Sequence, residues 1–118
     1  VNEERAKYNV APLKWDDSLA ALAESHCEDM IDRNFFAHNT PDGKTPFDRM
    51  KAAGISYSSA GENIAAGQSS PQNVMDSWMN SPGHRKNILN PDFEYIGVGL
   101  ARGGSYGIYW AQEFATFK

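Results

Sequence analysis

Apolar residues recur at helical spacing along much of the chain and change to a spacing of two in its last quarter. Between residues 16 and 34 the apolar positions form one stripe of a helix: Leu19, Leu22, Ala23, Cys27 and Met30. This stripe predicts a long helix that begins near Asp16 and ends at Asn34. Shorter helices are predicted over residues 1–8 and after each proline that follows a Ser or Thr able to cap: Pro46, Pro71 and Pro82.

The last quarter of the chain has the pattern of two strands. Aliphatic residues alternate with glycines over Tyr95–Leu100, and Tyr106–Phe117 is rich in aromatic residues. Gly103–Gly104 between them predicts a hairpin turn, and if these two are its central residues, Gly97 pairs with Trp110. Residues 55–67 lack helical periodicity and are interpreted as an irregular strand or loop. Helices first and a hairpin last predict an α+β domain with an antiparallel sheet.

Composition narrows the class of protein. The 118 residues are enough for one domain, predicted over 1–118, and carry 15 acids against 11 bases, a formal charge of -4. That balance argues against nucleic acid as a partner, because a phosphate backbone selects for a basic surface. No apolar run approaches the roughly 20 residues of a membrane span, and Val1 begins a charged, helix-like segment rather than a leader peptide.

Three residues are candidates for a chemical site. His38 lies in a loop, His84 stands two residues after a proline in the first turn of a predicted helix, and Glu62 lies among small residues. Two neutral imidazoles and a carboxylate suit zinc and would leave one position open for water or substrate. The alternative is that all three are unrelated surface residues. His26 and Cys27, on the apolar stripe, are interpreted as core residues.

The ordered set of motifs resembles the CAP superfamily (cysteine-rich secretory proteins, antigen 5 and pathogenesis-related proteins) in its short bacterial form. The matching stretches span nearly the whole chain: Val1–Arg5, Pro12–Asp16, Phe36–His38, Gly61–Ile64, Trp78, Ser81–Arg85 and Tyr109–Gln112. The resemblance implies a three-layer α-β-α sandwich with a central antiparallel sheet. It also implies a cleft with two histidines and two acids.

By motif, His38 and His84 match the two histidines of the family, and Glu62 matches the first acid. The second acid is expected a few residues after Trp78, where this chain reads Met79–Ser81 and has none. Asp76 and Glu113 are nearby or later acids, but neither matches the motif position. The disulfides of eukaryotic members are absent as well, since the chain has one cysteine.

Members of the superfamily are usually secreted, and some bind divalent metal at the two histidines. The first hypothesis is therefore a secreted or cell-envelope monomer that binds a divalent metal, zinc first, through His38, His84 and Glu62. Its partner would be an extracellular ligand, whether peptide, glycan, lipid or cell-wall component. A second hypothesis is a metal-dependent hydrolase of peptides or cell walls with Glu62 as catalytic base. A third is an interaction module in which the histidines only stabilise the fold.

Overall fold

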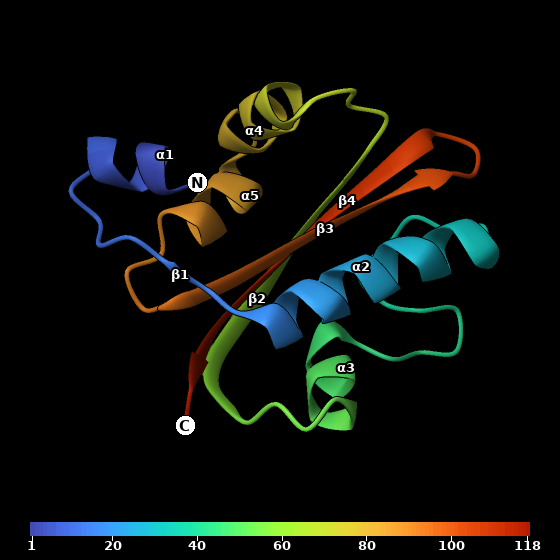
Figure 1. Ribbon diagram of the computed structural model, residues 1–118, viewed down its shortest axis with the longest axis horizontal. Helices are drawn as coiled ribbons and strands as arrows, with labels where there is room; N and C mark the ends of the chain where they lie inside the picture. The colour runs from blue at the N-terminus through green and yellow to red at the C-terminus, as the bar shows by residue number, and fades with distance from the viewer.

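A single four-stranded sheet lies between two layers of helices in the computed structural model, which describes residues 1–118 (Figure 1). The helices and strands follow along the chain as α1 (Asn2–Lys7), β1 (Lys14–Trp15), α2 (Asp17–Asp32), α3 (Pro46–Ala52), β2 (Tyr57–Ala66), α4 (Pro71–Met79), α5 (Pro82–Ile88), β3 (Tyr95–Gly103) and β4 (Gly107–Phe117). Helices α1, α4 and α5 lie on one side of the sheet, and α2 and α3 on the other. The predicted α-β-α sandwich is confirmed.

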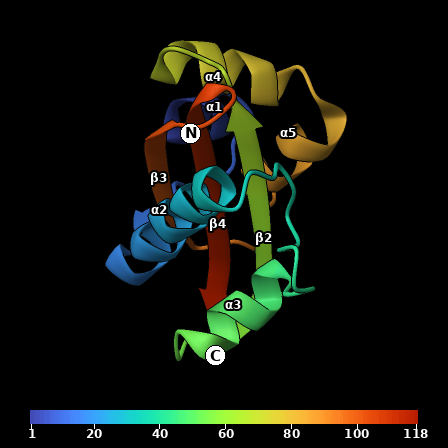
Figure 2. The same cartoon turned by 90° about the vertical axis from the view of Figure 1, so that its right-hand side faces the viewer.

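The sheet has the strand order β1-β3-β4-β2. Strand β4 lies at its centre and pairs antiparallel with both β2 and β3, while the two-residue β1 pairs parallel with the start of β3. In the side view, α2 crosses in front of the strands and α3 lies near the end of β2 (Figure 2). No helix is long and apolar enough to cross a membrane.

Sequence signals for helix ends agree with the structure. Asp16 caps α2 by accepting a hydrogen bond from the backbone N–H of Leu19, and Thr45 and Asp48 form the capping box of α3. Asn34 follows α2 with a positive φ of 52°, as expected for a residue that ends a helix.

Two strand predictions need correction. Residues 55–67 are not irregular: β2 is a ten-residue strand, and its small residues are stabilised by pairing with the aromatic-rich β4. The predicted hairpin register is wrong as well. Gly103 pairs with Gly107 across a three-residue loop, so Gly97 lies opposite Glu113 rather than Trp110.

The glycines of β3 serve the contact with α2. A Cβ at Gly97 would collide with the backbone of α2 at Ala20, and a Cβ at Gly99 would collide with it at Glu24. Their bare faces let the helix lie directly on the sheet.

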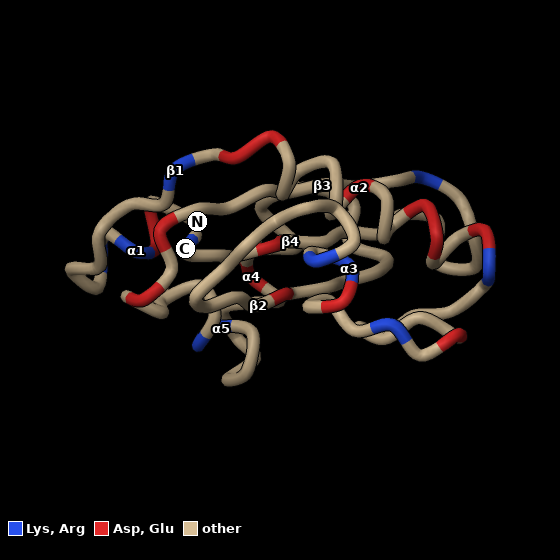
Figure 3. Tube along the Cα trace, turned by 90° about the horizontal axis from the view of Figure 1, so that it is seen from below, with Lys and Arg blue, Asp and Glu red and all other residues tan.

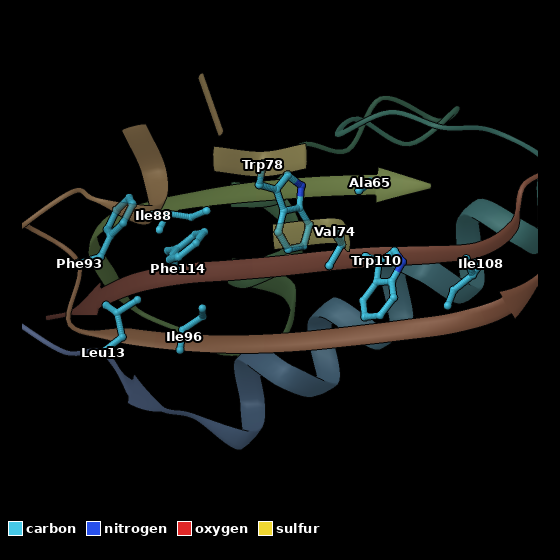
Figure 4. Close-up of a cluster of buried hydrophobic side chains, with 10 residues drawn as sticks. All are labelled: Leu13, Ala65, Val74, Trp78, Ile88, Phe93, Ile96, Ile108, Trp110 and Phe114. Carbon is cyan, nitrogen blue, oxygen red and sulfur yellow. The ribbon is translucent and has the colours of Figure 1, made fainter. Parts of the chain in front are cut away.

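Alternate residues of β4 enter two different cores. On the α4 and α5 side, aromatic and aliphatic residues form the largest cluster (Figure 4): Leu13, Ala65, Val74, Trp78, Ile88, Phe93, Ile96, Ile108, Trp110 and Phe114. On the α2 side, Tyr109 and Ala111 pack against Ala23, Cys27 and Met30. Cys27 is a core residue, as predicted, and burial, followed by the charge of Glu113, raises the pKa of its thiol to about 12.

Candidate functional site

Glu62 is the centre of a charged cluster on the α2 and α3 side of the sheet. Its side chain is 1% exposed, and its Oε1 accepts hydrogen bonds from His38 Nδ1 at 2.8 Å and Arg49 Nη2 at 3.2 Å. Arg49 Nη1 lies 2.9 Å from the second carboxylate oxygen, Oε2. Both oxygens of Glu62 are therefore engaged by cationic or polar groups of the protein itself.

Glu113 lies directly beside Glu62, because the two residues are register partners on β4 and β2. The acidic positions of these strands and a basic position of α3 are close together in the charge view (Figure 3). Glu113 is fully buried, and the nearest cationic atom, Arg49 Nη1, is 3.8 Å from its Oε2. One guanidinium thus faces two carboxyl groups.

The two carboxyl groups share one proton. Burial raises the pKa of Glu113 well above its usual value, and the hydrogen bond to Glu62 and the charge of Glu62 raise it further. Burial alone would also raise the pKa of Glu62, but hydrogen bonds from Glu113, His38 and Arg49 outweigh it and lower the pKa to about 2. At neutral pH, Glu113 is the neutral acid that donates a hydrogen bond, and Glu62 is the carboxylate that accepts it.

His38 is held by both its ring and its backbone. Its Nδ1 donates to the ionised Glu62, so the neutral ring carries its free lone pair on Nε2. The carbonyl of His38 accepts a hydrogen bond from Arg49 Nη2 at 2.7 Å, and the carbonyl before it, of Ala37, accepts one from His26 Nε2 at 2.9 Å. With 46% of its side chain exposed, His38 presents an oriented imidazole at the surface.

His84 comes from the opposite helical layer, in the first turn of α5. Asn63 Nδ2 donates to the carbonyl of His84 at 3.1 Å, and Asn87 Nδ2 donates to the carbonyl of Glu62 at 3.2 Å. These side chains tie α5 to β2 beside Glu62. Burial, and then the neighbouring His38, lower the pKa of His84, so its ring is neutral at neutral pH.

The structure thus joins His38 and Glu62 directly and places His84 within the electrostatic influence of His38. In its chemistry the donor set fits a divalent metal, because neutral imidazoles are good ligands for zinc. No group of three or more His, Cys, Asp or Glu side chains is arranged to hold an ion. The largest of the principal hollows, about 530 Å³, lies between α2 and α3 and is lined by His26 and Arg49 rather than by His38 or His84.

Comparison with known proteins decides the family. The profile described as "CAP: Cysteine-rich secretory protein family" matches residues 1–114. The chain belongs to the CAP family.

Bacterial CAP relatives are similar over almost the whole chain. The uncharacterized protein YkwD of Bacillus subtilis is 51% identical over 113 residues, which cover 96% of this chain and 43% of that protein. The uncharacterized membrane protein YlbC of the same organism is 36% identical, over 96% of this chain and 31% of its own length. The chain therefore spans less than half of these two relatives.

Solved structures agree with the fold. An extracellular protein of Bacillus anthracis that contains an SCP domain is 38% identical, with a TM-score of 0.85 over 97% of this chain and 37% of that one. An outer surface protein of Borrelia burgdorferi is 26% identical, with a TM-score of 0.91 over 99% of this chain and 86% of its own. These two CAP neighbours are extracellular or outer-surface proteins by name.

Within this CAP domain, sequence reasoning missed Arg49 and set Glu113 aside. The signal for Glu113 is its place in the strand: Tyr109, Ala111 and Ala115 share its face and are apolar, so a lone acid there needs a partner. The neighbouring strand has the same pattern around Glu62. The interpretation of His26 as a core residue is confirmed, since it is 2% exposed.

Proposed function

We propose that this chain is an extracellular or cell-envelope CAP domain that binds a divalent metal ion, zinc first, through His38 and His84. The ion would bind an extracellular ligand through its remaining coordination positions. Glu62, which the sequence proposed as a third ligand, has a different role in this proposal. It orients His38 instead of coordinating the ion.

The observation that carries the proposal is the 2.8 Å contact between His38 Nδ1 and the buried carboxylate of Glu62. Histidines that bind metal ordinarily donate their second ring N–H to a carboxylate or carbonyl, which fixes the tautomer and makes the ligating nitrogen more basic. A partly exposed histidine gains this arrangement only if the protein holds a carboxylate beneath it. Arg49 and Glu113 hold Glu62 in place and keep it ionised.

The state of His84 supports the same proposal. A histidine must be neutral to bind a metal, and the lowered pKa of His84 keeps its lone pair available. Two protein ligands leave at least two positions of a tetrahedral ion open. Those positions would accept water or a polar group of an extracellular peptide, glycan, lipid or cell-wall component.

The hydrolase hypothesis finds less support. A general base works best with a pKa near the working pH and within reach of the substrate. Glu62 has a pKa of about 2, its side chain is 1% exposed, and both oxygens already face protein groups. Glu62 therefore suits a positioning role better than proton transfer.

Calorimetric titration of zinc into the whole chain tests the proposal. The His38→Ala/His84→Ala variant should lose binding, and Glu62→Gln should weaken it by about 10- to 100-fold, as expected for loss of an orienting carboxylate. Asp76→Asn is the matched control, since Asp76 is an exposed acid outside the cluster, and it should leave the affinity unchanged. Equal zinc binding by the wild type and the double variant would overturn the proposal.

A further inference from the structure

The hollow between α2 and α3 is a separate feature of the same helical layer. Its volume of about 530 Å³ lies in the range of pockets that hold small organic ligands. Helix α2 supplies Ser25, His26 and Asp29 to its wall, and α3 supplies Arg49 and Ala52. The small side chain of Ala52 leaves the groove open between the two helices.

Two buried polar atoms of the residues that line this groove lack a partner in the protein: His26 Nδ1 and Arg49 Nε. The His26 residue is 2% exposed, and its Nε2 donates to the carbonyl of Ala37. The neutral ring must then carry a bare lone pair on Nδ1, which is an acceptor. Arg49 Nε carries a hydrogen and is a donor, while the other nitrogens of this guanidinium face Glu62 and His38.

An unpaired acceptor and an unpaired donor at one groove are costly unless something binds to both. A ligand that satisfies them offers an N–H or O–H to His26 and a carbonyl or hydroxyl oxygen to Arg49. This requirement excludes apolar ligands and simple anions, because an anion has no hydrogen for Nδ1.

The charges around the groove select a cation as the donor group. Its lining includes the carboxylates of Glu28, Asp29 and Asp32 against one free cation, Lys44. Asp29 is paired with Arg33 at 2.6 Å, which leaves two free carboxylates facing one ammonium group. An ammonium group on the ligand would find both the lone pair of His26 and a favourable field.

We propose that this groove binds the free amino terminus of a short peptide. The ligand ammonium donates to His26 Nδ1, and the first peptide carbonyl accepts from Arg49 Nε. A chain terminus carries both groups next to each other, whereas an internal segment of a peptide has no ammonium there. This site uses neither the ring of His38 nor that of His84, so it does not depend on metal binding.

The test is an NMR titration of the isotope-labelled whole chain with triglycine and, separately, with N-acetyl-triglycine. Triglycine should shift the backbone signals of α2 and α3 around His26 and Arg49, and acetylation should weaken binding at least about tenfold, because it removes the charged donor. Equal shifts from the two peptides, or no shift in these helices, would overturn the proposal.

Two variants test the groove itself. Ala52→Leu should block the groove and abolish the shifts, whereas Ala21→Leu, on the exposed surface of α2 outside the groove, should not. His26→Gln retains a donor for the carbonyl of Ala37 but removes the Nδ1 acceptor, so it should weaken triglycine at least about tenfold. Undiminished binding by either Ala52→Leu or His26→Gln would contradict the assignment.

Zinc titration of the same variants separates this proposal from the metal site. Ala52→Leu should bind zinc as the wild type does. Loss of triglycine binding with zinc binding intact would show two independent sites. An amino sugar such as glucosamine that binds more tightly than triglycine would overturn the choice of a peptide terminus.

Discussion

The two faces of the sheet each bury an arginine, and they compensate its charge in different ways. On the face of α1, α4 and α5, Arg5 is 1% exposed and its nitrogens donate to four backbone carbonyls: those of Ala11, Ile88, Asn90 and Phe93. On the face of α2 and α3, Arg49 lies against the carboxyl groups of Glu62 and Glu113. One arginine is solvated by neutral dipoles and the other by titratable acids.

This difference separates structure from chemistry. Carbonyl dipoles do not titrate, so the Arg5 face joins the end of α5 to the N-terminal helix at any ordinary pH. The Arg49 face contains a shared proton and an ionised carboxylate that orients a surface histidine. The arrangement suggests that the apolar face mainly provides stability and that the charged face prepares a site.

Replacing Arg5 should have the largest effect on stability. Arg5→Met leaves four carbonyls without a donor, and at about 1 kcal/mol for each the loss is roughly 4 kcal/mol. The loss should be the same at pH 5 and pH 8, because no acid is among the partners. Urea unfolding at both pH values measures it. Arg33→Met, at an exposed arginine with two carboxylate partners, is the control and should cost less than about 1 kcal/mol. Equal losses in the two variants would refute the special role of Arg5.

Replacing Arg49 should cost somewhat less and should depend on pH. Arg49→Met leaves the buried carboxylate of Glu62 with only His38 and Glu113, and breaking such a buried pair costs about 3 kcal/mol. Without the guanidinium the pKa of Glu62 rises, so the loss should be larger at pH 8 than at pH 5. The same urea series measures the difference, and a loss that does not vary with pH would contradict the account of this cluster.

Replacing Glu113 should have the smallest effect and the opposite sign. Its pKa is raised in the folded protein, so above its ordinary value of 4.5 the unfolded chain loses a proton that the folded protein retains. Wild-type stability from this group is therefore present at low pH and lost as the pH rises through the folded pKa. Glu113→Gln keeps a donor for Glu62 without this penalty.

The variant should match the wild type at pH 4 and gain stability above pH 4.5, by up to about 1.4 kcal/mol for each pH unit until the folded-state pKa is reached. Thermal unfolding across this pH range measures the gain. Glu94→Gln, at an exposed glutamate, should show no such trend. A variant that is less stable than the wild type at pH 8 would show that Glu113 is ionised in the fold.

Local signals predicted the fold well where they act over a few residues. Caps such as Thr45 and the apolar stripe of α2 place the helices correctly, because both depend on neighbours three or four residues away. Strand β2 was missed because its small residues have low strand propensity and gain their structure from β4, about fifty residues later. The hairpin register was wrong because a pair of glycines does not fix the length of a loop.

The site was predicted in part for the same reason. Motifs identified His38, Glu62 and His84 one by one, but no motif contains Arg49 or reports that Glu113 pairs with Glu62 across the sheet. Sequence spacing also gave Glu62 the role of a ligand. Only the contact geometry shows that its oxygens are already engaged with His38 and Arg49.

The most direct test is nitrogen-15 NMR of the histidine side chains at neutral pH, with and without zinc. The account predicts that His38 carries its proton on Nδ1 before zinc is added and that zinc shifts Nε2 of His38 together with one ring nitrogen of His84. A His38 ring protonated on Nε2, or zinc that leaves both rings unshifted, would contradict it.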